Sequence, residues 1–210
     1  MRAGCVVIVF ARAPVAGKAK TRLSAQLGAA GAAKLHARLA RQAVLTALRA
    51  GCGPVELHGT PWRHSFFRSC ARRYGVRVQP QRGADLGERM RRALAGALRR
   101  RRAALLIGSD CPALRARDLR RAARLLCGAC DVALAPAEDG GYALIGARSA
   151  SRLSFEGVRW GERGAYRQTT RNLDMRGLRW RALRTVWDVD RPEDLERLAA
   201  LRFRRIAGRF

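Results

Sequence analysis

A group of basic side chains follows the first apolar run of the chain, Cys5–Phe10. The group consists of Arg12, Lys18, Lys20 and Arg22. Lysine and arginine beside the turn residue Gly17 and the amino end of a helix suit a phosphate or pyrophosphate group. The GxxxxGKS or GxxxxGKT spacing of a Walker A loop is absent. The loop is therefore either a phosphate site of another kind or a solvated basic loop.

An aspartate, Asp110, stands shortly after a second apolar run, Leu105–Ile107, with Gly108 before it and Pro112 after it. A carboxylate at the carboxyl end of a strand is well placed to hold Mg²⁺ or Mn²⁺ against a diphosphate. The same residue type also serves as a helix cap or a turn aspartate. Taken alone, Asp110 leaves both interpretations open.

Two further acidic pairs occupy loops near the ends of apolar runs. Glu138 and Asp139 precede Gly140 and Gly141, a pattern typical of an acid pair at a cleft or of a plain hairpin turn. The second pair is Asp188 and Asp190. One of these could complete a metal site with Asp110, and Asp190 could equally cap the last helix.

Hydrophobic periodicity predicts the elements that must position these side chains. Strands are expected at Cys5–Phe10, Pro54–His58, Val76–Pro80, Ala103–Gly108, Val132–Pro136, Tyr142–Gly146 and Leu178–Val186. Helices are expected at Gly31–Ala50, Trp62–Tyr74, Asp85–Arg101, Arg117–Cys127, Gly164–Met175 and Pro192–Phe203. Such alternation predicts an α/β sandwich with a mainly parallel sheet, whose ligands bind beyond the carboxyl ends of the strands. Since no linker or repeat interrupts the pattern, we expect one domain over residues 1–210.

The charge balance narrows the function classes. The 210 residues include 43 lysines and arginines against 16 aspartates and glutamates, a net charge of +27. Such a chain invites a nucleic-acid interpretation, but the arginines are spread over nearly every predicted helix instead of forming one stripe. We therefore expect no specific nucleic-acid partner, and a raised affinity for small anions.

The remaining composition predicts a soluble, cytoplasmic protein. The longest uncharged stretch, residues 23–33, falls well short of the roughly 20 apolar residues of a membrane-spanning helix. The first apolar run is too short for a signal-peptide core. Of the six cysteines, Cys127 and Cys130 form a CxxC pair without a second pair or histidine cluster, so free thiols are expected.

Taken in order, these motifs resemble the DUF2064 family of proposed glycosyltransferases, some of which are associated with arsenosugar biosynthesis. The resemblance covers nearly the whole chain and rests on Phe10–Leu23, Gln81–Met90, Leu106–Leu114, Ala135–Gly146, the segment from Phe155, and Asp188–Leu195. The chain departs from the family pattern at Ala143, where a second aromatic residue is frequent, and matches it loosely over Gly161–Tyr166. More distantly, it is similar to the guanylyltransferases of molybdenum-cofactor and deazaflavin-cofactor synthesis.

The resemblance implies a Rossmann-like GT-A fold, that of the nucleotide-diphospho-sugar transferases, with a mainly parallel mixed sheet. It implies that Asp110 is the metal-binding aspartate, that Lys20 and Arg22 contact phosphates, and that Gln81–Arg89 helps to hold the nucleoside. The residues expected to bind the donor are Arg12, Lys20, Arg22, Gln81, Gly87, Arg89, Gly140 and Gly141. The metal ligands are expected among Asp110, Asp188 and Asp190.

We therefore expect a Mg²⁺- or Mn²⁺-dependent transferase that joins a nucleotide-sugar donor to a small-molecule acceptor. If the reaction inverts the sugar, Asp139 or Glu138 is the candidate to accept the acceptor's proton. The alternative is a nucleotidyltransferase that attacks the α-phosphorus of a nucleoside triphosphate. A more distant alternative is a basic nucleic-acid-binding protein.

Overall fold

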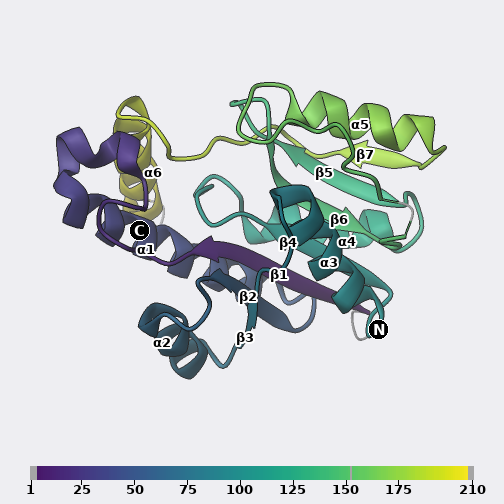
Figure 1. Cartoon of the computed structure of the whole chain (residues 1–210), viewed down its shortest axis with the longest axis horizontal. Helices are drawn as coiled ribbons and strands as arrows, with labels where there is room; N and C mark the ends of the chain where they lie inside the picture. The colour runs from purple at the N-terminus through teal and green to yellow at the C-terminus, as the bar shows by residue number, and fades with distance from the viewer. Residues whose placement is uncertain (1–3, 152, 208–210) are drawn as a thin grey trace.

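The computed structural model describes residues 4–151 and 153–207, with side chains as far as Leu201. Its centre is a seven-stranded sheet in the order β3-β2-β1-β4-β6-β5-β7 (Figure 1). The strands are β1 (Cys5–Arg12), β2 (Val55–Thr60), β3 (Arg77–Pro80), β4 (Ala103–Ile107), β5 (Val132–Pro136), β6 (Tyr142–Ala147) and β7 (Trp180–Ala182). The strands β1 to β4 are mutually parallel, and β6 runs antiparallel to both β4 and β5. The predicted α/β class with a mainly parallel mixed sheet is confirmed.

The sheet is buried on both faces, which explains the continuous apolar runs of its central strands. Val7 and Val9 of β1 join one core with α1 (Ser24–Ala50), α2 (Ser65–Tyr74) and α4 (Ala116–Leu126). Val6 and Ile8 point into a second core with α3 (Leu86–Leu98) and α5 (Ala165–Met175). Because successive side chains of a strand alternate between faces, one apolar strand contributes to both cores.

The last helix, α6 (Glu193–Ala207), lies beside the first turns of α1 (Figure 1). A small third core joins it to this part of the chain, with Leu198 of α6 against Leu23 and Leu39 and with Val189 completely buried. This core ties the loop before α6 to the segment that follows β1. The loops 13–20 and 183–192 therefore meet at one edge of the sheet.

Several predicted boundaries differ from the structure, and two of the differences concern the loops at the site. The strand predicted at Leu178–Val186 is limited to Trp180–Ala182, and Leu183 and Val186 both join the core on the α1 side of the sheet. Residues three apart cannot share one face of a regular strand, and Val186 forms only an isolated bridge with Ala137. The first helix begins earlier than predicted, at Ser24, across a break where Gly28 adopts a φ of 67°.

No helix in the part of the chain that the structure describes is both long and apolar enough to cross a membrane. The four loops that carry the candidate site residues follow β1, β4, β5 and β7. All four lie at the carboxyl edge of the parallel strands.

Candidate functional site

Backbone and thiol hydrogen bonds join the loops at the carboxyl edge of the sheet. The amide of Val189 donates to the carbonyl of Asp110 at 2.9 Å, and the amide of Glu138 donates to the carbonyl of Val186 at 3.0 Å. The thiol of Cys111 donates to the carbonyl of Trp187, also at 3.0 Å. These bonds fix the loop after β4 against the segment that leads into α6, although almost 80 residues separate them along the chain.

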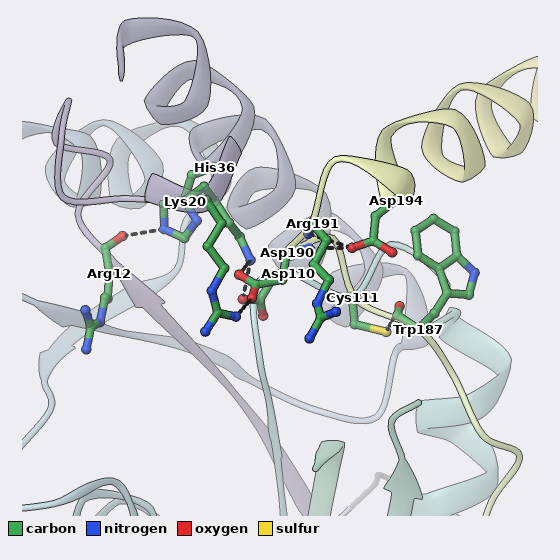
Figure 2. Close-up of polar contacts among 10 residues, drawn as sticks. Arg12, Lys20, His36, Asp110, Cys111, Trp187, Asp190, Arg191 and Asp194 are labelled. Carbon is green, nitrogen blue, oxygen red and sulfur yellow. Dashed lines mark hydrogen bonds and ion pairs between the residues drawn. The ribbon is translucent and has the colours of Figure 1, made fainter. Parts of the chain in front are cut away.

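The structure places Lys20 between the carboxylates of Asp110 and Asp190 (Figure 2). Its Nζ lies 2.9 Å from Asp110 Oδ2 and 3.5 Å from Asp190 Oδ1. The Lys20 side chain is only 6% exposed, whereas those of Asp110 and Asp190 are 40% and 36% exposed. The ammonium group is thus enclosed behind two carboxylates that still face solvent.

The backbone of Lys20 is left-handed, with φ 52° and ψ 46°, which is unfavourable for a residue with a Cβ. It is followed at once by a short 3₁₀ helix, Thr21–Leu23, and then by α1. Strained residues persist where the surrounding structure holds them. Here the buried ammonium and its two carboxylate partners hold the loop in place.

Arg22 approaches the same cluster from its solvent side. Its guanidinium pairs with Asp190, and its side chain is two-thirds exposed. The backbone amides of Asp190 and Arg191 donate to the carboxylate of Asp194, at 2.9 and 2.7 Å. The carboxylate of Asp190 therefore faces the basic loop, and Asp194 secures the turn before α6.

The electrostatics of this cluster are dominated by burial and by charges close together. Burial opposes the charge on Lys20, but Asp110, Asp190 and Asp188 outweigh it and raise its pKa. Burial likewise opposes the charge of Asp110, and Lys20 lowers the pKa of that carboxyl below its ordinary value. For Asp188, burial and then the nearby carboxylates of Asp139 and Asp110 raise the pKa to about 6. Lys20 therefore remains charged, and Asp188 is the carboxylate with the least compensated charge.

The structure separates the two members of the predicted acid pair. Glu138 is engaged by Arg197 of α6 in a two-pronged ion pair at 2.8 and 3.0 Å, which lowers the pKa of its carboxyl. Asp139 is exposed and accepts a hydrogen bond from the amide of Gly141 at 2.8 Å. Asp139 is thus the member of the pair that acts electrostatically on Asp188.

Gly140 and Gly141 provide the turn between β5 and β6. Gly140 adopts a φ of 92°, and a Cβ there would lie 2.9 Å from the amide nitrogen of Gly164. Only glycine permits this conformation and this close approach of another backbone segment. The pair therefore holds the hairpin that presents Asp139.

The residues expected to hold the nucleoside lie on the β1–β2–α3 side of the same edge. The Gln81 amide donates to the carbonyls of Ala11 and His58, at 3.1 and 2.8 Å, and so joins the ends of β1 and β2. Arg89 donates through Nε to the carbonyl of Gly83 at 3.0 Å. At Gly87, a Cβ would come within 2.8 Å of Phe155, so this glycine allows close packing of the 155–160 segment on α3.

Arg12 is the candidate residue that turns away from the cluster. Its side chain is exposed and points away from Lys20 and Asp110 (Figure 2). Its backbone carbonyl accepts a hydrogen bond from Nε2 of His36 at 3.1 Å. A carbonyl can only accept, so the bond assigns the ring proton of His36 to Nε2.

Sequence reasoning missed His36 and Asp194. His36 is buried on α1 beside the Lys20 loop, and burial lowers the pKa of its imidazole. The available signal was its position next to Leu35 and three residues before Leu39, which places a polar side chain on the apolar face of the predicted helix. Asp194 lies in an ordinary helix-start sequence, which gives no hint of a contact with the neighbouring loop.

The donor set of the cluster suits a hard divalent cation. Asp110, Asp188 and Asp190 supply carboxylate oxygens, the ligand type that Mg²⁺ and Mn²⁺ prefer. Burial, followed by repulsion from Asp139 and Asp110, raises the pKa of Asp188, and a bound cation relieves both of these costs of the charged carboxylate. Among the described residues, however, no group of three histidine, cysteine, aspartate or glutamate side chains could hold a metal ion by itself. A metal here would need further ligands from substrate or water.

Comparison with known families gives one match. Residues 43–162 match the model of the family described as "Uncharacterized protein conserved in bacteria (DUF2064)". This match confirms the resemblance inferred from the motifs. No protein of curated function matches the sequence.

Comparison with solved structures gives many matches of the same fold. A candidate nucleotide-diphospho-sugar transferase from Desulfovibrio desulfuricans G20 shares 28% identity, with a TM-score of 0.81 over 90% of this chain and 83% of that one. A nucleotidyl transferase from Methanothermobacter shares 18% identity, with a TM-score of 0.63 over 95% and 98% of the two chains. The glucosyl-3-phosphoglycerate synthase of Mycobacterium tuberculosis, solved with Mn²⁺ and uridine diphosphate, shares 12% identity, with a TM-score of 0.59 over 90% and 73%. The chain has the nucleotide-diphospho-sugar transferase fold.

Proposed function

The chain belongs to the bacterial DUF2064 family, and on that premise we propose that it is a metal-dependent glycosyltransferase with a nucleotide-diphosphate-sugar donor. The observation that carries the proposal is the cluster in which Lys20 and Arg22 meet Asp110 and Asp190 at the carboxyl edge of the sheet. Cations for a diphosphate and carboxylates for a divalent metal stand side by side there. The likeness to a candidate nucleotide-diphospho-sugar transferase supports the same reaction class.

In this proposal Asp110 is the principal protein ligand of Mg²⁺ or Mn²⁺, together with Asp188 or Asp190. The metal, when bound, neutralises negative charge that develops on the leaving diphosphate. Asp110 and Asp190 now pair with Lys20, so metal binding requires Lys20 to exchange these carboxylates for another anion. The diphosphate of the donor is that anion.

Lys20 and Arg22 would bind the diphosphate oxygens and hold them as the glycosidic bond breaks. The left-handed backbone of Lys20 and the 3₁₀ helix that follows it place the ammonium at this edge of the sheet before substrate arrives, where it would exchange carboxylate oxygens for diphosphate oxygens. The Arg12 side chain points away from the cluster and in this conformation would not contact the diphosphate. Gln81, Gly87 and Arg89 would border the nucleoside.

Asp139 is the group we propose to accept the proton of the acceptor if the sugar is inverted. It lies at the exposed tip of the β5–β6 hairpin and close enough to Asp188 to raise the pKa of that carboxyl. Glu138 is the weaker candidate, because its ion pair with Arg197 lowers its pKa and so makes the carboxylate a poorer base.

Nucleotidyl transfer is the second candidate function. The fold likeness to a nucleotidyl transferase over almost the full length of both chains favours it. The same basic loop and aspartates would then serve a nucleoside triphosphate, with attack at the α-phosphorus by a phosphorylated acceptor. The two reactions differ in the leaving group, which is a nucleoside diphosphate in one and pyrophosphate in the other.

The test begins with a thermal-shift screen of nucleoside diphosphates, nucleoside triphosphates and nucleotide sugars, each with and without Mn²⁺. A ligand at 100 times its dissociation constant stabilises the fold by about 2.7 kcal/mol. Stabilisation by a nucleotide sugar and release of nucleoside diphosphate on turnover support glycosyl transfer, and release of pyrophosphate supports nucleotidyl transfer. If no nucleotide shifts the melting temperature with Mn²⁺, the proposal is wrong.

A further inference from the structure

A second strongly basic site lies on the α3 face of the sheet, away from the Lys20 cluster. It is a groove of about 230 Å³ between α3 and the edge formed by β2 and β3. The arginines that line it are Arg77, Arg82, Arg89, Arg92, Arg99 and Arg100. Half of the groove's twelve lining residues are thus arginines, a higher share of basic residues than in the cavity beside α5 or the one between α1 and α2.

The acidic groups near the groove are already engaged. Glu56, the one carboxylate that lines it, is buried and accepts from Arg100 Nη2 at 2.6 Å and from His58 Nε2 at 3.1 Å. Outside the groove, Glu88 accepts from Arg92 Nε at 2.8 Å. Two of the six arginines therefore have carboxylate partners.

The other four arginines, Arg77, Arg82, Arg89 and Arg99, form no ion pair with the side chains of residues 4–151 and 153–201. Gathering like charges around one concave surface is unfavourable without an anion to share. The guanidinium group offers a planar fork of donors that fits two oxygens of a phosphoryl group at once. The groove has the electrostatics of a site for such a group.

The groove is separate from the Lys20–Asp110 cluster. Glu56 on its floor and Leu106 of β4 both pair with Ile8 of β1, so one strand stands between β2 and β4. Asp110 lies four residues beyond Leu106, past the end of β4. With strands about 4.8 Å apart and a rise of about 3.3 Å per residue, Glu56 and Asp110 are on the order of 15 Å apart.

We propose that this groove binds a small phosphorylated molecule through its phosphoryl group, at a site distinct from the one proposed for the donor diphosphate. Its volume is below the roughly 300–1,000 Å³ of pockets that enclose drug-sized ligands, so it fits one phosphorylated small molecule. A nucleic acid would instead need basic side chains along an extended surface. The inference does not depend on the proposed transferase reaction.

The test is calorimetry in metal-free buffer containing EDTA, with glucose 6-phosphate, inorganic phosphate and unphosphorylated glucose as probes. The test variant is Arg77→Gln with Arg99→Gln, two exposed arginines of the groove that form no ion pair with any described residue. Arg117→Gln with Arg121→Gln is the control, since it removes the same charge from exposed positions on α4, on the other face of the sheet. Arg82 and Arg89 are left unchanged because they belong to the Gln81–Arg89 stretch that is expected to border the nucleoside.

We expect the wild-type protein and the α4 control to bind glucose 6-phosphate alike and the groove variant to bind at least about tenfold more weakly, because two charge-assisted hydrogen-bond donors are lost. Glucose alone should not bind. Equal affinity for inorganic phosphate would support the site and identify the phosphoryl group as the whole ligand, whereas tighter binding of the ester would show that the sugar contributes.

Three outcomes would overturn the proposal. Absence of binding by the wild-type protein at millimolar probe excludes the site. An equal loss in the α4 control attributes binding to the overall charge of +27. Loss of glucose 6-phosphate binding in Lys20→Ala places the phosphoryl group in the other cluster. Since metal and turnover are absent from this experiment, its failure leaves the proposed transferase reaction untouched.

Discussion

Replacing Asp110 by asparagine separates the catalytic contribution of this carboxylate from its structural one. The change keeps the shape of the side chain and removes the charge that lies 2.9 Å from Lys20 Nζ. At an effective dielectric constant of about 20, two unit charges at that separation attract by about 6 kcal/mol. Desolvation of Lys20 offsets most of this, and the 40% exposure of the Asp110 side chain screens the rest.

The expected loss of stability is therefore small, about 1–2 kcal/mol, because Asp190 remains as a carboxylate partner of Lys20. For a chain of this size it corresponds to a fall in melting temperature of roughly 3–6 °C. The catalytic effect should be much larger. If Asp110 is the main protein ligand of the metal, metal-dependent turnover should fall at least about a hundredfold, roughly 3 kcal/mol of transition-state stabilisation.

The assay is turnover against Mn²⁺ concentration, accompanied by thermal denaturation without metal. Asp131→Asn is the matched control, because Asp131 pairs with Arg179 and Arg148 at the start of β5, at the opposite edge of the sheet. That control should keep near wild-type turnover. If folded Asp110→Asn keeps near wild-type turnover at low Mn²⁺, another residue holds the metal and the reasoning is refuted.

Three other predictions follow from single contacts. Lys20→Ala should weaken the binding of nucleoside diphosphates at least roughly tenfold in calorimetry and leave the binding of the free nucleoside little changed, because the proposal has the ammonium contact only the phosphates. Asp118→Asn should lower the free energy of unfolding, measured by urea denaturation, by about 2 kcal/mol, since the buried carboxylate loses a two-pronged ion pair with Arg184 at 2.7 and 3.1 Å. Burial alone would raise the pKa of Asp118, but the bonds from Arg184 lower it. Its stabilisation is therefore complete above the unfolded-state value of about 3.9 and is lost as the pH falls through the lower folded value. Gly59→Ala should lower the free energy of unfolding in the same urea denaturation by about 1–3 kcal/mol, because the new Cβ would lie 2.6–2.8 Å from three ring atoms of buried Phe67.

Each of these predictions has a clear contrary result. If Lys20→Ala weakens the binding of the nucleoside and of the nucleoside diphosphate equally, Lys20 does not belong to the phosphate site. A stability difference between wild-type and Asp118→Asn protein that persists unchanged below pH 3 would rule out the ionised pair as its source. Gly128→Ala is the control for Gly59→Ala, since a Cβ at Gly128 meets no atom within 4 Å. If both changes cost the same, the steric argument is wrong.

Most of the fold was predictable from the sequence because the signal is local. The central strands are continuous apolar runs, and the helices carry apolar residues three to four apart, so their order along the chain indicates an α/β sandwich. The predicted strand at Leu178–Val186 failed because β7 is an edge strand. There the burial of Leu183 and Val186 depends on β5 and on the loop before β6, and not on a local alternation.

The candidate site was predictable in part for the same reason. The sequence places Lys20, Asp110, Asp139 and Asp188 just after strands, and parallel strands bring such residues to one edge of a sheet. Sequence alone could not decide between the alternatives at each loop. Whether Asp190 caps α6 or faces the basic loop depends on which partner lies nearest in space.

The sequence by itself determined the fold class, the family and the loops that could do chemistry, because strand and helix patterns and motif order are local properties of the chain. Only the tertiary structure decided that Lys20 is enclosed by Asp110 and Asp190, and that Arg197 engages Glu138 but not Asp139. The same holds for the arginine groove, whose residues come from β2, β3, α3 and the segments on either side of α3. The strength of a charge depends on its burial and on its neighbours in space, and the packing of segments distant in sequence fixes both.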